Sequence, residues 1–134
     1  MPVVDASVLV EFLRDGQHAE VAEERLDAEE HTLWAPHLID AEVGHALRRW
    51  VCLGRLNAEA AGKALWEVGD LPLERVEHEQ LVPVAWQLRH NFSFYDALYV
   101  ALALMVDEPL LTFDARLARA GARTGVDLPI EVLA

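Results

Sequence analysis

Short apolar segments alternate with longer amphipathic segments along the whole chain, and this order constrains the fold more than any other feature. Five segments have the length and pattern of short, mostly buried strands: residues 2–5, 32–35, 73–77, 109–113 and 129–133. The segments between them are predicted helices: residues 6–14, 17–30, 36–53, 57–68, 79–90, 93–106 and 114–120. Since strands that alternate with helices form parallel sheets covered on both faces, the sequence predicts an α/β fold.

Length and composition fit one folded domain over residues 1–134. Hydrophobic residues make up 53% of the chain and charged residues 25%, which excludes a disordered protein. The longest apolar run, residues 97–106, is shorter than the about 20 residues that cross a bilayer. Asp5 and Glu11 fall where a secretion signal would be apolar, and a single Cys52 allows no internal disulfide. We therefore expect a cytoplasmic protein without membrane contact.

Four acidic residues occupy positions at which a carboxylate is expected to have a structural or chemical role. Asp5 and Asp114 directly follow predicted strands, at the edge of a parallel sheet where ligands bind. Each also suits the N-cap of the helix that follows it. Asp96 lies three residues after Ser93, as in a capping box, yet its neighbours are apolar. Glu42 falls within the apolar stripe of its predicted helix, where it is either buried or reaches water or an arginine from the edge.

Taken together, the four carboxylates predict a metal site. Carboxylates that share a pocket repel one another and cannot all stay ionised without a positive partner. Mg²⁺ and Mn²⁺ prefer oxygen ligands, bind phosphate oxygens and lower the pKa of bound water, which is the chemistry of phosphodiester hydrolysis. The net charge of −12 argues against binding nucleic acid through bulk positive charge, but not against an enzyme that uses metal ions and a local basic patch.

Three motifs resemble those of the PIN-domain ribonucleases: residues 4–7 (VDAS), 95–103 (YDALYVALA) and 111–117 (LTFDARL). With Glu42 on a helix between the first two, their order and spacing resemble the small single-domain VapC toxins of toxin–antitoxin pairs. The resemblance covers essentially the whole chain. It implies a three-layer α/β/α sandwich around a central parallel sheet.

The resemblance also implies which residues act. It assigns catalysis to four acids: Asp5, Glu42, Asp96 and Asp114. It assigns the binding of Mg²⁺ or Mn²⁺ to three of them: Asp5, Asp96 and Asp114. Ser7 and Thr112 match hydroxyl positions near the metal. The implied activity is metal-dependent endoribonuclease cleavage of RNA by activated water.

The partners that the resemblance implies are a second copy of the chain and an antitoxin of the VapB type. Such an antitoxin inserts a C-terminal segment into the active-site groove. An arginine in that segment could pair with the carboxylates and block the metal site.

Clustered arginines and tryptophans leave several interpretations open. Arg116 and Arg119, with Arg123, share one side of the last predicted helix, where they could guide an RNA backbone or simply face solvent near a helix C-terminus. A second group could contact RNA, a second copy or the antitoxin: Arg48, Arg49 and Arg55. The four tryptophans are expected in the core or a dimer interface: Trp34, Trp50, Trp66 and Trp86.

Other functions fit the residues less well. A catalytically silent PIN-like module that only binds another protein would keep the scaffold, but it has no need of all four acids. An aspartate-based receiver requires a second acid beside Asp5 and a late lysine, whereas the sole lysine is Lys63. An Asp-x-Asp phosphatase is disfavoured by Ser7. The six histidines have no zinc-binding spacing.

Overall fold

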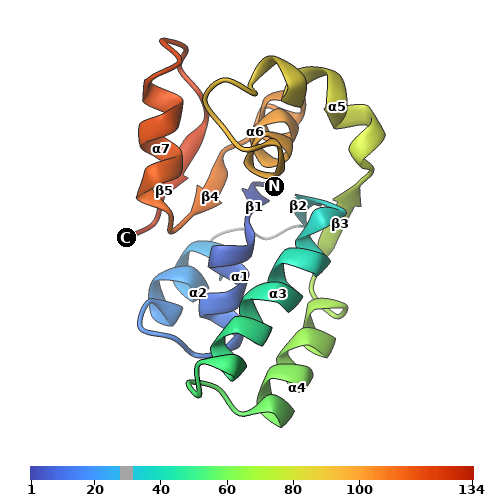
Figure 1. Cartoon of the computed structure of the whole chain (residues 1–134), viewed down its shortest axis with the longest axis vertical. Coiled ribbons are helices and arrows are strands. Elements are labelled where there is room, and N and C mark those ends of the chain that lie inside the picture. Colours follow the sequence, from blue (N-terminus) through green and yellow to red (C-terminus); the bar gives the residue numbers. More distant parts are fainter. Residues whose placement is uncertain (28–31) are drawn as a thin grey trace.

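The computed structural model describes residues 1–27 and 32–134. Within these residues, five strands form one parallel sheet in the order β3-β2-β1-β4-β5 (Figure 1). The strands are β1 (Val3–Val4), β2 (Leu33–Pro36), β3 (Leu73–Val76), β4 (Leu110–Thr112) and β5 (Ile130–Val132). The parallel α/β arrangement predicted from the alternation of strands and helices is therefore confirmed.

The centre of the sheet is β1, where the direction of the chain across the sheet reverses. The chain passes outward from β1 through β2 to β3, and then returns to β4 on the other side of β1. Val3 and Val4 of β1 pair with residues of β4 in register. Ligand sites of open parallel sheets lie at such switch points, beyond the carboxyl ends of the strands. Asp5 follows β1 directly and Asp114 lies two residues beyond β4, so both stand at this edge.

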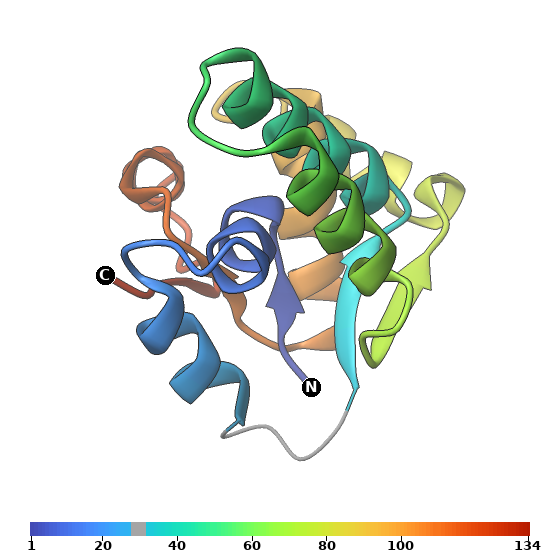
Figure 2. The ribbon, with the colours of Figure 1, turned by 90° about the horizontal axis from the view of Figure 1, so that it is seen from below.

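Two layers of helices cover the sheet (Figure 1, and Figure 2 from below). On one face lie α1 (Ala6–Leu13), α2 (Ala19–Asp27), α3 (Leu38–Cys52) and α4 (Ala58–Val68). On the other face lie α5 (His78–Gln87), α6 (Phe94–Val106) and α7 (Ala115–Ala122). Right-handed crossovers explain this division, because the chain crosses the sheet in opposite directions before and after β3. The architecture is the three-layer α/β/α sandwich that the resemblance implied.

Helix α6 forms the apolar centre of its layer. It contacts β1, β2 and β4, and residues 97–103 are all buried. Its ends are defined by the side chain of Ser93, which accepts a hydrogen bond from the backbone N–H of Asp96 at 3.1 Å, and by Asp107 in the left-handed conformation with φ 54°. The cap holds Asp96 at the start of a buried helix, as the sequence predicted.

Several predicted boundaries were wrong for identifiable reasons. Pro36 is the last residue of β2 and not the first turn of the next helix, which begins at Leu38. A proline has no N–H to donate, and the ladder bond at this point comes from His37, whose N–H donates to the carbonyl of Val76 at 3.0 Å.

Two further helix ends differ from the sequence-based prediction. Helix α7 does not stop before Gly121, because this buried glycine serves close packing: a Cβ there would lie 2.9 Å from Ile130 Cδ1. Helix α1 ends at Leu13, one residue before the predicted end, and Asp15 after it is in the left-handed conformation with φ 53°. The predicted helix 17–30 corresponds to α2, and residues 28–30 lie outside the described residues.

The tryptophans do not all belong to the core. Trp34 and Trp50 are half-buried against it. Trp66 and Trp86 are 83% and 56% exposed, so neither belongs to the core, and a place in a dimer interface stays a prediction for both. Among the described helices, none has the length and apolar character needed to span a membrane.

Candidate active site

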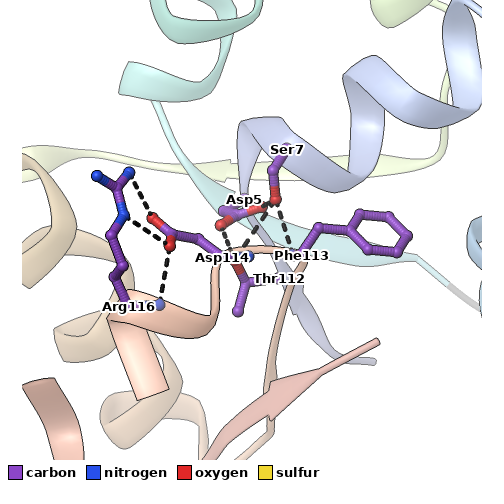
Figure 3. A network of polar contacts seen from close by, with 6 residues as sticks. All are labelled: Asp5, Ser7, Thr112, Phe113, Asp114 and Arg116. Atoms are coloured by element: carbon purple, nitrogen blue, oxygen red, sulfur yellow. Dashed lines mark hydrogen bonds and ion pairs between the residues drawn. The ribbon is translucent and has the colours of Figure 1, made fainter. Parts of the chain in front are cut away.

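Asp5 is the centre of a polar network at the switch point between β1 and β4 (Figure 3). Its Oδ1 accepts hydrogen bonds from the Ser7 hydroxyl at 2.6 Å and from the backbone N–H of Val8 at 3.3 Å. Its Oδ2 accepts a hydrogen bond from the Thr112 hydroxyl at 2.5 Å. Asp5 is thus both the N-cap of α1 and an anchor to β4. The capping and the metal-binding interpretations of its position are compatible, since a carboxylate has lone pairs left over.

The hydroxyls of Ser7 and Thr112 connect Asp5 to the loop after β4. The backbone N–H of Phe113 donates to Ser7 Oγ at 2.9 Å, and the backbone N–H of Asp114 donates to Thr112 Oγ1 at 2.9 Å. Each hydroxyl therefore accepts from the loop and directs its own hydrogen to Asp5. The two hydroxyl oxygens are 3.4 Å apart with both hydrogens already engaged. This network fixes the loop that carries Asp114 relative to the end of β1.

Burial raises the pKa of Asp5 to about 6, although the hydrogen bonds from Ser7, Thr112 and the backbone act in the opposite direction. Removal from water disfavours the charged carboxylate, and the donors around it recover only part of that cost. The carboxylate at the centre of the site is consequently short of positive charge.

The pKa values of Glu42 and Asp96 are raised as well. Burial raises the pKa of Glu42, and the charge of Asp96 raises it further, while Tyr99 and His45 partly oppose the shift. Burial also raises the pKa of Asp96, helped by the charge of Asp114. Since Asp96 is the acid whose charge acts on Glu42, Glu42 in the stripe of α3 lies near the start of α6.

Tyr99 lies among three of the four acids. Burial and the charges of Glu42, Asp5 and Asp96 all raise the pKa of its phenol, so it stays protonated. Its hydroxyl is buried and, within the described part of the chain, has no hydrogen bond of normal geometry. The sequence analysis missed this residue. Its signal was present, because Tyr99 is the one side chain with a polar group in the buried stretch 97–103 and lies one turn after Asp96.

Asp114 is the N-cap of α7 and pairs with Arg116 (Figure 3). Its carboxylate accepts hydrogen bonds from the backbone N–H of Arg116 at 2.9 Å and from the guanidinium at 3.2 and 3.3 Å. Burial works to raise the pKa of Asp114, but the bonds and charge of Arg116 outweigh it, and the net shift is downward. Arg119 adds only a more distant charge. Asp114 is therefore the one acid of the four whose charge is already compensated within the described chain.

A groove of about 870 Å³ opens beside these acids, between α1 and α3. At one end it is lined by Ser7, Glu42 and Arg116. It continues along α3 to the end of that helix, where the lining residues are Arg49, Trp50 and Arg55. Of the two arginines predicted to bind RNA, Arg116 lines the groove, and Arg119 is not among the described residues that do.

The α1–α2 connection forms another wall of the groove, which the sequence analysis did not identify. The carboxylate of Glu11 accepts from the Arg14 guanidinium at 2.7 Å and from the backbone N–H of His18 at 3.0 Å. The ring of His18 stacks on Phe113, with ring centres 5.4 Å apart. The spacing of Glu11 and Arg14, one helical turn apart, was the available signal.

The donor set fits a hard divalent cation in its chemistry. All four side chains offer carboxylate oxygens, which Mg²⁺ and Mn²⁺ prefer, and three of the four have pKa values raised in a way that a nearby cation would reverse. Within residues 1–27 and 32–134, no three acidic, histidine or cysteine side chains already stand close enough to ligate one ion. Metal binding would therefore require the carboxylate side chains to move closer to one another around the ion.

Comparison with known proteins gives the same picture. The PIN domain family matches residues 3–123. Ribonuclease VapC1 of Mycobacterium tuberculosis (strain ATCC 25618 / H37Rv) is 50% identical over 119 residues, which cover 88% of this chain and 89% of the relative. Ribonuclease VapC9 of the same strain is 40% identical over 123 residues, covering 90% and 91%. A chain of VapBC2 from Rickettsia felis, crystallised with a DNA fragment from their promoter, shares the fold, with a TM-score of 0.70, 13% identity and 98% of both chains covered.

The chain belongs to the PIN-domain family, whose model matches residues 3–123, and its parallel α/β/α sandwich is consistent with the fold of that family. Within it, the degree of identity to the mycobacterial relatives identifies the chain as a VapC-type ribonuclease.

Proposed function

We propose that this protein is the toxin of a type II toxin–antitoxin pair and acts as a Mg²⁺- or Mn²⁺-dependent endoribonuclease. The observation that carries the proposal is the group of carboxylates around Tyr99, three of which have pKa values raised by burial. Such a group is costly for folding, since the cations nearby, His45 for Glu42 and Arg116 for Asp96, offset the effect of burial only in part. A divalent cation in the same place removes that cost and supplies a reason for the arrangement.

Asp5, Asp96 and Asp114 are the proposed metal ligands. When bound, Mg²⁺ or Mn²⁺ binds phosphate oxygens and lowers the pKa of a coordinated water. The hydroxyls of Ser7 and Thr112 hold the carboxylate of Asp5 in one orientation by directing their hydrogens at its two oxygens. Arg116 donates hydrogen bonds to both carboxylate oxygens of Asp114, and the lone pairs that these bonds leave over would bind the metal.

Glu42 is the proposed proton acceptor. Its pKa is raised by burial, which brings the carboxylate closer to the range in which a base works near neutral pH. In the reaction, the water oxygen would bond to phosphorus, the bond from phosphorus to the leaving ribose oxygen would break in line, and the proton of the water would pass to Glu42. The leaving ribose oxygen would take up a proton from solvent water. Burial and the neighbouring carboxylates keep Tyr99 protonated, so this residue adds no charge to the site.

RNA as substrate, an antitoxin as partner and a homodimer as assembly state are parts of the same proposal. The relatives at 40–50% identity are named ribonucleases, which supports RNA. The fold neighbour from Rickettsia felis is one chain of a VapBC2 assembly, which supports a VapB-type partner. A segment of that partner in the groove would reach Glu42 and Arg116 at its acidic end.

Mapping of new RNA ends tests the proposal. Purified protein, freed of any antitoxin, is incubated with total RNA and Mg²⁺ or Mn²⁺, and the same reaction is run with EDTA. We expect discrete ends with metal and none with EDTA. Asp5→Asn and Asp96→Asn should abolish the ends, whereas Asp70→Asn, a change of the same kind on the exposed surface after α4, should leave them unchanged.

The alternative, a catalytically silent module that acts by binding, predicts a different pattern. Growth inhibition in cells would then survive both Asp5→Asn and Asp96→Asn, and the purified protein would produce no new ends with any metal. Cleavage that persists in either variant would contradict the assigned mechanism while leaving the ribonuclease activity in place.

A further inference from the structure

The groove of the candidate site continues well beyond the acids. Glu42 lines one end, and Arg49 follows seven residues later, about 10 Å further along the same face of α3. Arg55, beyond the end of α3, lines the far end together with Trp50. One continuous groove therefore joins the proposed nuclease centre to a pair of arginines.

Within residues 1–27 and 32–134, Arg49 and Arg55 form no ion pair with an acidic side chain. Arg14, by contrast, forms an ion pair with Glu11 at 2.7 Å. The guanidinium of Arg55 lies 5.5 Å from the centre of the Trp50 ring, a contact that orients the side chain and leaves its hydrogen-bond donors available.

We propose that Arg49 and Arg55 form a phosphate-binding subsite for the single-stranded RNA that the protein cleaves, so that the strand runs along α3 from the acids to this end of the groove. The inference rests on the proposed ribonuclease function. A chain with 23 acidic and 11 basic residues repels a polyanion over most of its surface, so cations inside the groove must supply the local attraction. Arg116, at the other end, is already bonded to Asp114.

The walls of the groove favour unpaired RNA over an acidic peptide as the occupant. Trp50 and the stacked pair of His18 and Phe113 line it. Because the guanidinium of Arg14 already lies 4.0 Å from the centre of the Trp50 ring, the rings of His18 and Phe113 are the aromatic surface that suits the faces of unstacked bases. An acidic peptide would use the arginines but not these rings. Arg49 and Arg55 would then fix the phosphates, and the aromatic rings would contact the bases between them and the acids.

A charge-matched pair of double variants tests the subsite. Arg49→Gln with Arg55→Gln removes the proposed contacts. Lys63→Gln with Arg89→Gln removes the same charge from exposed positions outside the groove lining. Both are compared with the wild type for binding of a short random-sequence single-stranded RNA in EDTA, where cleavage does not occur, at several salt concentrations.

We expect the groove variant to bind this RNA about tenfold more weakly or worse, and its dependence of log Kd on log salt to fall by about 0.7 for each lost contact. The control variant should change both quantities far less. In cleavage assays with Mn²⁺, KM should rise in the groove variant while kcat stays near the wild-type value, since a phosphate contact remote from the cut bond binds substrate and transition state alike.

The possible results separate this inference from the function on which it rests. A wild-type protein that neither binds nor cleaves RNA contradicts the proposed function. A wild-type protein that cleaves, with groove and control variants equally affected, contradicts the subsite. A groove variant that binds RNA normally but no longer binds poly-glutamate would assign the two arginines to an acidic peptide and overturn the proposal.

Discussion

At the scale of single residues, hydrogen bonding and burial act in opposite directions on the pKa of Asp5. Every donor around its carboxylate favours the ionised form, yet burial wins and raises the pKa to about 6. Burial of the Asp5 carboxylate is unfavourable for the isolated chain, although several hydrogen-bond donors surround it. Strongly shifted pKa values of this kind are typical of functional sites. Ser7 and Thr112 keep the orientation of the carboxylate, and in the proposed function a divalent cation would supply the missing charge.

The first prediction concerns Asp5→Asn and the pH dependence of stability without metal. The folded pKa of about 6 lies above the unfolded value of 3.8, so between these pH values the folded state holds a proton that the unfolded state has lost. Stability is therefore expected to fall as pH rises from about 4 to about 6, by roughly 2 kcal/mol after allowance for remaining solvent contact. Urea unfolding in EDTA across this range measures it.

In the Asp5→Asn protein that decrease should be smaller by the same amount, and the variant should be the more stable of the two above pH 6 in EDTA. Glu42 and Asp96 shift in the same direction and remain in both proteins, so the difference between the curves isolates Asp5. Parallel curves would show that Asp5 titrates normally in the folded protein.

The second prediction concerns Thr112, whose hydroxyl is buried and serves as donor to Asp5 and acceptor for the N–H of Asp114. Thr112→Val keeps the shape but leaves both partners unsatisfied, which should lower the free energy of unfolding by about 1–3 kcal/mol. Cleavage should fall with it, because the loop of Asp114 loses its anchor. Thr112→Ser should restore most of both, and failure of this rescue would point to the methyl group instead.

At the scale of elements, the start of α3 is attached to the edge of the sheet from outside the helix. The preceding residue, His37, provides no side-chain cap. Instead the Nε2 atom of His78, on α5, accepts from the N–H of Leu38 at 2.9 Å. Arg75 of β3 donates two hydrogen bonds, at 2.7 and 2.8 Å, to Asp40 in the first turn. These contacts fix the helix that presents Glu42 one turn later.

The third prediction follows from this attachment. Within the described residues, His78 is the only side chain that accepts a hydrogen bond from a backbone N–H in the first turn of α3. His78→Ala removes this acceptor and should lower the free energy of unfolding by about 1 kcal/mol. Because Glu42 is carried by the same helix, kcat of the proposed cleavage should fall more than KM rises. His90→Ala, at an exposed position, is the control. An unchanged kcat in a destabilised His78→Ala protein would limit the role of His78 to stability.

At the scale of the whole molecule, the excess of acid dominates. A net charge of −12 over 134 residues makes the folded chain repel itself, and the buried carboxylates concentrate that repulsion at one edge of the sheet. Simple salt screens such repulsion between exposed charges, but much less between buried ones. The repulsion between exposed charges and the repulsion between buried carboxylates can therefore be separated by the choice of cation.

The fourth prediction uses that separation. MgCl₂ or MnCl₂ should raise the free energy of unfolding of the wild type more than NaCl of equal ionic strength does, by up to about 3 kcal/mol once the ion is near a hundred times its Kd. This extra stabilisation by the divalent cation over NaCl should be absent in Asp5→Asn and Asp96→Asn, and EDTA should remove it from the wild type. Thermal or urea unfolding measures it. Equal effects of Mg²⁺ and matched NaCl would argue against a specific metal site.

Much of the architecture could be predicted from the sequence because its signals are local. The alternation of strands and helices, the Ser93 cap of α6 and the Asn57 cap of α4 all depend on residues near one another in the chain. Predictions failed where a distant contact decided the outcome. Gly121 stays in a helix because Ile130 packs on it, and Pro36 stays in a strand because β3 pairs beside it.

The sequence by itself determined that the sheet is parallel and that Asp5 and Asp114 stand at the ends of strands, since periodicity and chain order are properties of neighbouring residues. Only the tertiary structure decided that these strands are adjacent. That adjacency brings Ser7 and Thr112, 105 residues apart, to the same carboxylate, and sets Tyr99 among the acids. The reason is physical: strand order and helix packing are fixed by burial of the whole apolar core, and no local pattern encodes which buried side chains will meet.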